Sequence, residues 1–387
     1  MSSPTRSEPD RCPGLLRVHA AADGGLARVR LPGGRLSGPR LGALADAAAE
    51  LGDGFLELTS RANVQVRGLA DGAEAELGAR LQDAGLLPSS THERVRNIVA
   101  SVLSGRDGNG FLDVRPLVTA LDEALCADEA LANLSGRFLF TLDDGRGDVV
   151  AMRGDVGLFA VAPDTFALVL AGADSGIRVR LDEAVEAVLN VARDFLRLRT
   201  TEWRVAELGA ERLVPSARSE PVAIPASPYR VPLGRIAQRD GRTALSGLVP
   251  LGRLDPAPLR AVEEIIVTPW RGVVIPDLTD VPHFDGLVTT PASGWEGLTS
   301  CAGRPGCAKA LTDVRADAAA SRARAGTGGR PVHWSGCERQ CGRPAERHVA
   351  VVAGPDGYEV RSGDEVRARP SNLAATAAAV AATRRSE

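Results

Sequence analysis

Four cysteines in the last quarter of the chain have a spacing and neighbours that could bind a metal group. They form two motifs, C-x5-C from Cys301 to Cys307 and C-x3-C from Cys337 to Cys341, each beside glycine and proline. A [4Fe-4S] cluster needs four thiolates that converge from different directions and backbone N–H groups aimed at its sulfides. Glycine lets the backbone approach that closely. We therefore interpret the four cysteines as ligands of a [4Fe-4S] cluster.

Two other interpretations of these cysteines stay open. Zinc sites favour pairs separated by two to four residues and rarely use five. Disulfides are rare in reducing compartments, and the chain opens without a recognisable signal peptide, so we expect a cytoplasmic location. Cys12 and Cys126 have no other cysteine at ligand spacing, and the sequence assigns them no role.

Composition limits the class of protein. The 387 residues are 44% hydrophobic and 25% charged, which is ordinary for a globular chain of two or three domains. The formal net charge of −3 gives no electrostatic case for nucleic acid, and no apolar run approaches the roughly 18 residues of a membrane span. Lys309 is the one lysine, so an acidic ligand would be held by arginines, which bind carboxylates bidentately.

Two pairs of similar segments indicate an internal duplication. Residues 59–66, TSRANVQV, are similar to residues 268–275, TPWRGVVI. Residues 134–137, LSGR, are similar to residues 334–337, WSGC. In both pairs the second copy begins about 200 residues after the first, so the repeated unit spans roughly 200 residues.

Hydrophobic periodicity predicts the elements of the first unit. The predicted helices cover residues 41–51, 73–84 and 181–198, and the predicted strands cover residues 26–31, 55–58 and 64–66. In the second unit, residues 249–259 are expected to repeat the strand, turn and helix start of residues 29–41.

A duplicated chain with these two cysteine motifs resembles the sulfite and nitrite reductase superfamily, whose members place a [4Fe-4S] cluster beside a tetrapyrrole at a pseudo-twofold axis. The resemblance covers nearly the whole chain and implies an α+β fold. Within the superfamily, the opening CPGLLR at residues 12–17 and TPWRG at residues 268–272 are most similar to the branch that hydroxylates a precorrin in aerobic cobalamin biosynthesis. The implied domains are ferredoxin-like half-domains at 12–85 and 233–290, α/β domains at 90–214 and 291–387, and a proline-rich linker at 215–232.

The resemblance also carries pocket residues onto matching motifs of this chain. An R-x-x-x-Q segment lines the tetrapyrrole pocket of the superfamily, and here it matches Arg61 to Gln65. Asn63 and Arg67 would share one strand face with them, because alternate residues of a strand point the same way. The alternative is that this row is an exposed polar strand face.

The superfamily's R-N pair matches Arg96 and Asn97, and Arg271 in the TPWRG segment is expected to join the same pocket. Sulfite and nitrite reductases also carry a K-x-K pair that binds and protonates the small anion. Here those positions read Arg137-Phe-Leu139, so the second lysine is absent. That difference argues against six-electron reduction and is compatible with an arginine that binds an acidic macrocycle.

The resemblance implies a complete reaction. The substrate would be precorrin-3A, a tetrapyrrole with acetate and propionate side chains, and an NADH- and O2-dependent monooxygenase would hydroxylate it with lactone formation. No G-x-G-x-x-G follows a predicted strand and no P-loop is present, so a separate reductase or ferredoxin is expected to reduce the cluster.

A non-haem iron is also associated with this branch, but the sequence does not identify its ligands. The alternatives are a sirohaem-dependent nitrite or sulfite reductase, and a non-catalytic iron–sulfur or zinc protein that binds a partner.

Overall fold

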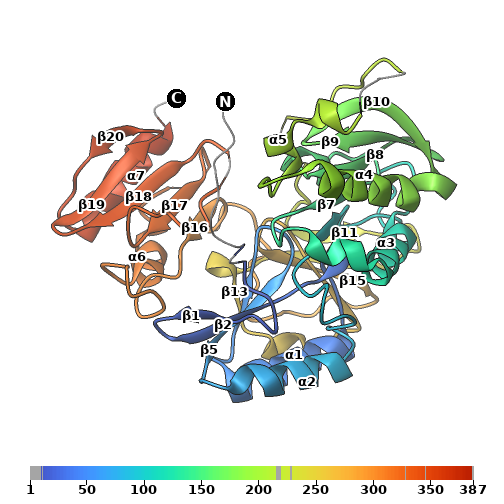
Figure 1. Cartoon of the computed structure of the whole chain (residues 1–387). Helices are drawn as coiled ribbons and strands as arrows, with labels where there is room; N and C mark the ends of the chain where they lie inside the picture. The colour runs from blue at the N-terminus through green and yellow to red at the C-terminus, as the bar shows by residue number, and fades with distance from the viewer. Residues whose placement is uncertain are drawn as a thin grey trace.

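The computed structural model describes residues 10, 12–214, 219–226, 229–326, 328–344 and 346–385. These residues form four five-stranded sheets. Two of the sheets form separate lobes, and the helices α1 (Gly38–Leu51) and α2 (Ala73–Asp83) lie below them at the base of the molecule (Figure 1). None of the described helices is long and apolar enough to cross a membrane.

The two sheets of the base exchange strands between the halves of the chain. β13, from the second half, pairs with β4 of the first half, and β3, from the first half, pairs with β14 of the second. Two copies of one unit related by a pseudo-twofold axis produce such a reciprocal exchange. The strand orders are β1 (His19–Ala21), β2 (Gly24–Val29), β5 (Val64–Leu69), β4 (Leu56–Leu58), β13 (Arg253–Leu254) and β11 (Gly234–Ala237), β12 (Thr243–Leu248), β15 (Gly272–Leu278), β14 (Glu264–Val267), β3 (Arg35–Ser37).

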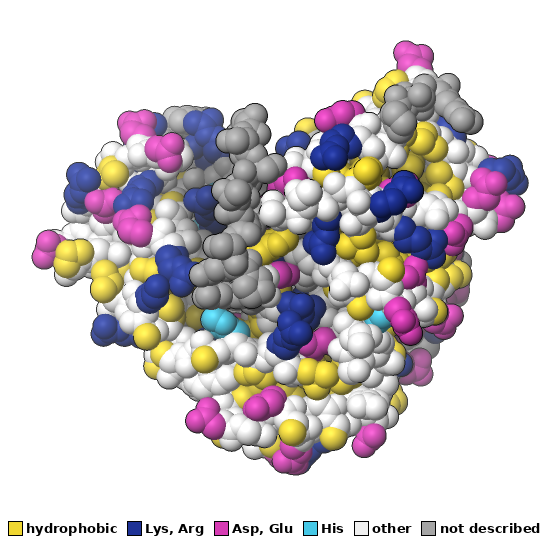
Figure 2. All heavy atoms as spheres, viewed as in Figure 1, with side chains coloured by type: hydrophobic (Ala, Val, Ile, Leu, Met, Phe, Trp, Pro, Cys, Tyr) yellow, Lys and Arg dark blue, Asp and Glu magenta, His cyan; other side chains and the backbone are white. Residues whose placement is uncertain are grey.

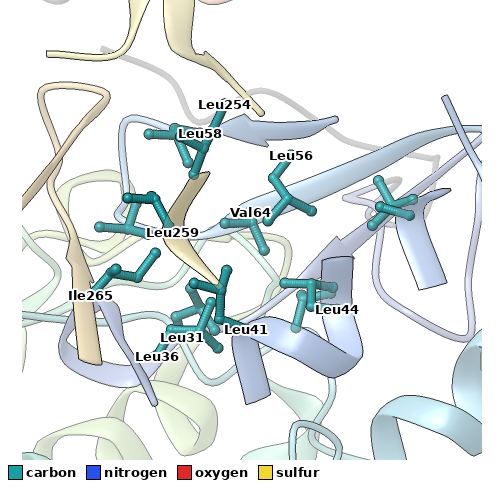
Figure 3. Close-up of a cluster of buried hydrophobic side chains, with 14 of the residues drawn as sticks. Leu31, Leu36, Leu41, Leu44, Leu56, Leu58, Val64, Leu254, Leu259 and Ile265 are labelled. Carbon is teal, nitrogen blue, oxygen red and sulfur yellow. The ribbon is translucent and has the colours of Figure 1, made fainter. Parts of the chain in front are cut away.

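One apolar core lies at both exchanged strands (Figure 3). Leu36 on β3 and Ile265 on β14 are fully buried in it, as are Leu56 on β4 and, with 3% exposure, Leu254 on β13. Protein cores are packed as densely as organic crystals, so side chains from both halves are needed to fill this one. The apolar face of each half is therefore buried by the other half.

The two lobes have the same topology, which confirms the predicted duplication and the α+β class. In each lobe three parallel strands are followed by two antiparallel ones. The first lobe contains β6 (Ile98–Ala100), α3 (Arg115–Ala127), β7 (Phe140–Asp143), β8 (Val156–Ala162), β9 (Thr165–Leu170), β10 (Ala173–Arg180), α4 (Ala184–Leu198) and α5 (Val205–Leu208). The second contains β16 (Leu298–Ser300), α6 (Val314–Ser321), β17 (Val332–Ser335), β18 (Val349–Gly354), β19 (Gly357–Ser362), β20 (Glu365–Ala368) and α7 (Leu373–Arg385).

The first sequence repeat is the same turn in both halves. The hydroxyl oxygens of Thr59 and Thr268 each accept a hydrogen bond from the backbone N–H four residues later, at 3.1 Å in both cases. Ala62 and Arg271, the fourth residues of the two turns, have left-handed φ angles of 55° and 58°. The offset between these segments is therefore a structural equivalence.

The second sequence repeat is not a structural equivalence. Residues 134–137 precede β7, whereas residues 334–337 include the end of β17. Strand pairing instead aligns Ala100 and Leu142 of the first lobe with Ser300 and Trp334 of the second. A match of two letters carries no strand periodicity, so it does not determine register.

The second half also differs from the prediction at residues 249–259. The expected helix start is a single 3-10 turn, Ala257–Leu259, whereas the first half has a helix of 14 residues, α1. Pro256 and Pro258 explain the difference, because proline lacks the N–H that a helix interior needs and clashes with the preceding turn. In the predicted linker, residues 215–218 and 227–228 lie outside the described residues.

Candidate functional site

Parallel strand pairing places the first cysteine of each motif. β16 and β17 are parallel neighbours, so their carboxyl ends meet at one edge of the sheet, where Cys301 and Cys337 follow them. The N–H of Cys301 donates to the carbonyl of Trp334 at 2.9 Å, and the N–H of Gly336 donates to the sulfur of Cys301 at 3.2 Å. The strand ends therefore bring both cysteine loops together.

The other two cysteines belong to the same neighbourhood. Burial raises the pKa of the Cys341 thiol, and the thiols of Cys301, Cys337 and Cys307 raise it further, whereas Arg339 lowers it. The four sulfurs are thus close enough to interact electrostatically. None of them forms a disulfide.

Two glycines allow the cysteine loops to pack closely against neighbouring residues. A Cβ at Gly303, whose φ is +69°, would lie 2.8 Å from the side chain of Val314, and a Cβ at Gly336 would lie 2.6 Å from Ala310. No side chain fits at either position. The soft thiol donors and the close backbone approach suit a [4Fe-4S] cluster, for which Cys301, Cys307, Cys337 and Cys341 are the candidate ligands. Among the described residues no three of these side chains lie close enough together to hold a single metal ion.

His333 supports the second cysteine loop. Its ring is fully buried, with Nδ1 2.9 Å from the Thr299 hydroxyl and Nε2 donating to the carbonyl of Cys341 at 3.2 Å. Burial first, and then the charge of Arg271, lower the pKa of His333 to about 3. The imidazole is therefore neutral near pH 7 and positions the loop through a backbone contact.

A row of arginines lies on the strands of the first half. Arg28 on β2 is opposite Gln65 on β5. With the Gln65 amide oriented so that its oxygen faces Arg28, the Nη2 and Nε groups of Arg28 donate to that oxygen at 2.6 and 3.0 Å. Arg30 follows β2 and is 2% exposed. The guanidinium groups of Arg30 and Arg61 both lie 3.5 Å from the carbonyl oxygen of Gly136.

Within the described part of the chain, Arg28, Arg30 and Arg61 have no ion pair with a carboxylate, and Nη1 of Arg30 has no hydrogen-bond partner. Burial lowers the pKa of all three guanidinium groups. The pKa of Arg30 lies well below its usual value, and after burial the largest cause is the positive charge of Arg28. The pKa of Arg61 is lowered to about 10, and after burial the largest cause is the positive charge of Arg204. Asp10, Glu93 and Asp155 raise the pKa values of Arg28, Arg30 and Arg61 respectively, but by less than burial lowers them. Buried charges in proteins are normally paired, so these arginines are candidates to bind a polyanion.

The corresponding face of the second half is apolar. The shared turn and strand register place Ser246 and Val274 where the first half has Arg28 and Gln65. Trp270 stands in the place of Arg61 and packs with a buried apolar cluster. Its fully buried members are Val102, Leu103, Val231, Ala244, Ile266 and Val274. The duplicated fold therefore presents this arginine face once.

Three of the predicted pocket residues have internal partners. Asn63 and Asn97 are buried, and the amide of Asn63 donates to that of Asn97 at 3.2 Å. Asn97 in turn donates to the carbonyl of Gly136 at 2.9 Å, which positions the segment beside the arginines. Arg96 points to the other side of the chain and binds Asp122 bidentately at 2.6 and 2.7 Å.

The segment at the expected K-x-K position has one polar and one apolar end. Arg137 is exposed, and its guanidinium carbon lies 4.9 Å from the ring centre of Trp203. Leu139 is 3% exposed and packs with Val99 and Val149. A buried leucine therefore occupies the place of the second lysine of the reductases.

A cavity of about 560 Å³ lies beside the arginine row, on the side of the first lobe. Its arginines Arg17, Arg94 and Arg199 have no ion pair with a carboxylate in the residues described. Figure 2 shows basic side chains on this face near the place where the lobes meet the base. The lining residues are Asp10, Arg17, Ser90, Thr91, Glu93, Arg94, Ala132, Asn133, Leu134, Ser135, Arg199 and Trp203.

Sequence reasoning missed Arg28 and Arg30. The available signal was their spacing of two residues in a predicted strand, which places both on one face. Their pairing with the strand of Gln65 could not be read from the sequence, because it depends on β-sheet register.

Comparisons with known proteins agree with this arrangement. Residues 19–84 match the nitrite/sulfite reductase ferredoxin-like half domain. The ferredoxin–nitrite reductase of Synechococcus elongatus is 29% identical over 88% of this chain and 78% of its own. The precorrin-3B synthase of a Sinorhizobium species is 26% identical over 90% of this chain and 81% of its own. The structure of the Mycobacterium tuberculosis NirA protein has a TM-score of 0.68 at 20% identity, covering 88% of this chain and 75% of that one.

The relatives that this chain resembles over most of its length include oxidoreductases. The chain contains the ferredoxin-like half domain of the nitrite and sulfite reductases and is similar over most of its length to members of that superfamily. That superfamily uses sirohaem and [4Fe-4S] cofactors in general.

Proposed function

We propose that this chain is a precorrin-3B synthase, an O2-dependent monooxygenase that hydroxylates precorrin-3A and forms a lactone. Electrons would come from NADH through an external reductase or ferredoxin and pass through the [4Fe-4S] cluster. The unpaired arginines support an acidic tetrapyrrole as the ligand. The observation that carries the choice of reaction is the burial of Leu139 at the position of the second reductase lysine.

Arg28, Arg30 and Arg61 would bind carboxylate side chains of the macrocycle. Hydrogen bonds between ionised groups are short and strong, and a planar guanidinium matches a carboxylate bidentately. Losing one partner of a buried pair costs on the order of 2–5 kcal/mol, because the other charge is left unpaired. Asn63 and Asn97 would act indirectly, by holding the carbonyl of Gly136 against these arginines.

Proton supply separates the two candidate reactions. Reduction of nitrite or sulfite consumes protons, and the reductases place lysines at the anion for that purpose. Here Leu139 has no proton to give, and Lys309 lies exposed in the first cysteine loop. Hydroxylation needs fewer protons: one atom of O2 enters the substrate, the other leaves as water, and two electrons and two protons are supplied.

When bound, the cluster supplies one-electron transfer next to the macrocycle. The resemblance also implies a non-haem iron. Among the described residues no group of three or more His, Cys, Asp or Glu side chains is placed to hold one metal ion. The ligands of that iron are therefore not identified among these residues.

A sirohaem-dependent nitrite or sulfite reductase is the second candidate. The nitrite reductase of Synechococcus elongatus is slightly more identical to this chain than the precorrin-3B synthase, at 29% against 26%. The same arginines would then hold the carboxylates of sirohaem, and the four cysteines would hold the cluster that supplies its electrons.

The test begins with the anaerobically purified protein. Iron, sulfide and zinc analysis with pigment extraction establishes which groups are bound, and precorrin-3A is then added with a reduced electron donor and O2. Gain of one oxygen atom by the substrate, measured by mass spectrometry and lost without O2, supports the proposal. Extracted sirohaem together with nitrite-dependent oxidation of the donor would overturn it.

A further inference from the structure

Arg67, predicted to bind the tetrapyrrole, contacts the first cysteine loop in the structure. Its guanidinium is held by Asp23 through two hydrogen bonds of 2.9 and 3.0 Å and lies 3.7 Å from Glu57. Nη2 also donates to the carbonyl oxygen of Gly306 at 2.8 Å. Gly306 immediately precedes Cys307, so this bond reaches a residue beside a cluster ligand.

The contact at Gly306 is part of a larger connection between the base and the second lobe. A Cβ at Gly306 would lie 3.0 Å from both Arg67 and Asp23, so the loop is as close as a bare backbone allows. Glu57 also accepts a hydrogen bond from Arg315 on α6, the helix that follows the first cysteine loop. Both ends of this loop region are therefore tied to the strands of the first half.

Arg271 makes the corresponding contact from the second half. It ends the turn before β15, and its Nη2 donates to the carbonyl oxygen of Gly342 at 3.0 Å. Gly342 immediately follows Cys341, and a Cβ there would lie 3.1 Å from the same nitrogen. In the described residues Arg271 has no ion pair with a carboxylate.

We propose that Arg67 and Arg271 are positioning residues that clamp the two cysteine loops, one from each half of the duplicated base. The clamp rests on the cluster assignment made above. It sets the separation of the loops that carry the four thiols and places two guanidinium groups beside them, of which that of Arg67 is paired with Asp23. Nε and Nη2 of Arg67 are held by Asp23 and Gly306, so this edge of the guanidinium faces the first cysteine loop.

The clamp also affects electron transfer. The reduction potential of an iron–sulfur cluster depends on net charge and on the hydrogen bonds and residues around its ligands. A reduced cluster carries one more negative charge, which a neighbouring guanidinium stabilises. Removing either arginine should therefore shift the midpoint potential to a more negative value.

The experiment is hydrogen exchange and redox titration of the holoprotein carrying Arg67→Ala, Arg67→Lys, Arg271→Ala or Arg271→Lys. Arg212→Ala is the matched control, because Arg212 is exposed and its side chain contacts no described partner. Arg67→Ala is expected to speed amide exchange about tenfold or more in residues 301–312, and Arg271→Ala in residues 336–344. Both alanine variants should also lower the midpoint potential of the cluster.

The lysine variants separate charge from geometry. Arg67→Lys keeps the positive charge but loses the planar guanidinium and its paired donors. The midpoint potential should therefore change less than in the alanine variant, while amide exchange stays fast. If an alanine variant does not fold, the lysine variant at the same position provides the test. Exchange and potential equal to those of Arg212→Ala would overturn the clamp, as would weaker tetrapyrrole binding with unchanged loops. If the cluster forms and the clamp behaves as expected but no precorrin is hydroxylated, the proposed function fails and the clamp does not.

Discussion

Ser101 and Cys301 occupy the same position in the two lobes. Each is the residue after the first of two parallel strands, and the pairing of β6 with β7 matches that of β16 with β17. Their partners differ. The hydroxyl of Ser101 donates to Asp148 at 2.7 Å, whereas the sulfur of Cys301 accepts the N–H of Gly336.

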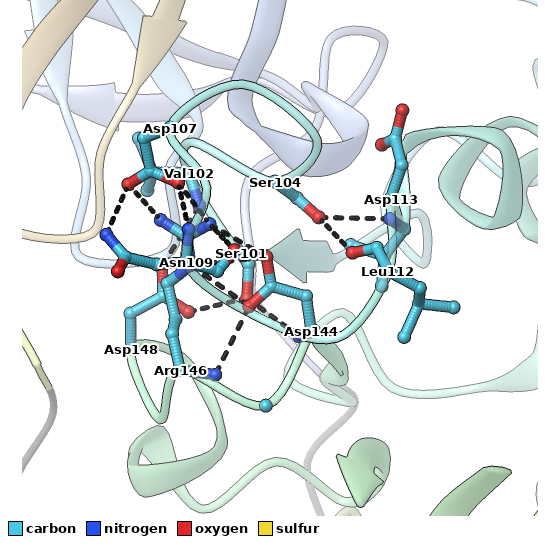
Figure 4. Close-up of polar contacts among 12 residues, drawn as sticks. Ser101, Val102, Ser104, Asp107, Asn109, Leu112, Asp113, Asp144, Arg146 and Asp148 are labelled. Carbon is cyan, nitrogen blue, oxygen red and sulfur yellow. Dashed lines mark hydrogen bonds and ion pairs between the residues drawn. The ribbon is translucent and has the colours of Figure 1, made fainter. Parts of the chain in front are cut away.

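The position of the cluster site in the second lobe is filled by polar side chains in the first (Figure 4). Asp107 follows Ser101 by six residues, as Cys307 follows Cys301. Asp107 binds the buried guanidinium of Arg146 at 3.0 Å, and Asp144 binds it at 2.8 Å. The duplicated fold thus has a thiol site in one lobe and, at the corresponding position in the other, an internal network of ion pairs and hydrogen bonds.

The cysteine assignment predicts a difference between two serine variants. Cys301→Ser should abolish the cluster, because it removes one of four thiolates, whereas Cys126→Ser on α3 should retain it. Iron and acid-labile sulfide per chain measure this. Full iron and sulfide in Cys301→Ser would refute the assignment, and zinc without sulfide in the unaltered protein would replace it with a zinc site.

Arg146 is predicted to be a major stabilising residue of the first lobe. Arg146→Met leaves the buried carboxylates of Asp107 and Asp144 without their cation, which should cost about 3–5 kcal/mol of unfolding free energy. The control is Arg180→Ala, which breaks an exposed pair with Asp164 worth less than about 1 kcal/mol. Urea unfolding midpoints measure both losses, and equal losses would contradict the prediction.

Asp148 predicts a pH dependence of stability. Burial, and next the charge of Asp143, raise the pKa of Asp148 to about 7. The folded state then binds this proton more tightly than the unfolded state, so its stabilising contribution is complete below about pH 4 and falls towards pH 7. Asp148→Asn should flatten that fall, which is at most about 1.4 kcal/mol per pH unit for one group. An unchanged slope of unfolding free energy against pH would count against Asp148 as its source.

Arg61 is predicted to trade stability for ligand binding. Burial, and next the charge of Arg204, lower the pKa of Arg61, so the folded chain disfavours the charged form and Arg61→Met should raise unfolding stability by roughly 1 kcal/mol. The same change should weaken binding of a polycarboxylate porphyrin at least about tenfold. Calorimetric unfolding and a fluorescence titration check the two effects, with Arg212→Ala as control. Unchanged affinity would move the binding site away from Arg61.

Strand exchange predicts that the halves do not fold separately. A fragment of residues 1–215 lacks β13 and β14, which complete the pairing of β4 and β3. It should show no cooperative unfolding, and co-expression with residues 216–387 should restore a folded complex. A fragment that folds cooperatively would contradict the shared core.

The cysteine motifs, the duplication and the R-x-x-x-Q segment were predictable from the sequence, because each is a local spacing that strand ends and turns preserve. The shared turn at Thr59 and Thr268 shows this directly. The second repeat did not predict a structural equivalence, because two identical residues do not determine strand register.

Tertiary structure decided what each arginine contacts. Arg96 pairs with Asp122 on a helix, and Arg67 reaches Gly306, which is 239 residues away in the sequence. Arg28 and Arg30 became candidates because burial lowers their pKa values, and Asp10 and Glu93 raise them without forming an ion pair with them among the described residues. An arginine side chain is long and flexible, so its role depends on which distant segment the fold brings within hydrogen-bond distance of the guanidinium, and no local pattern in the sequence records that.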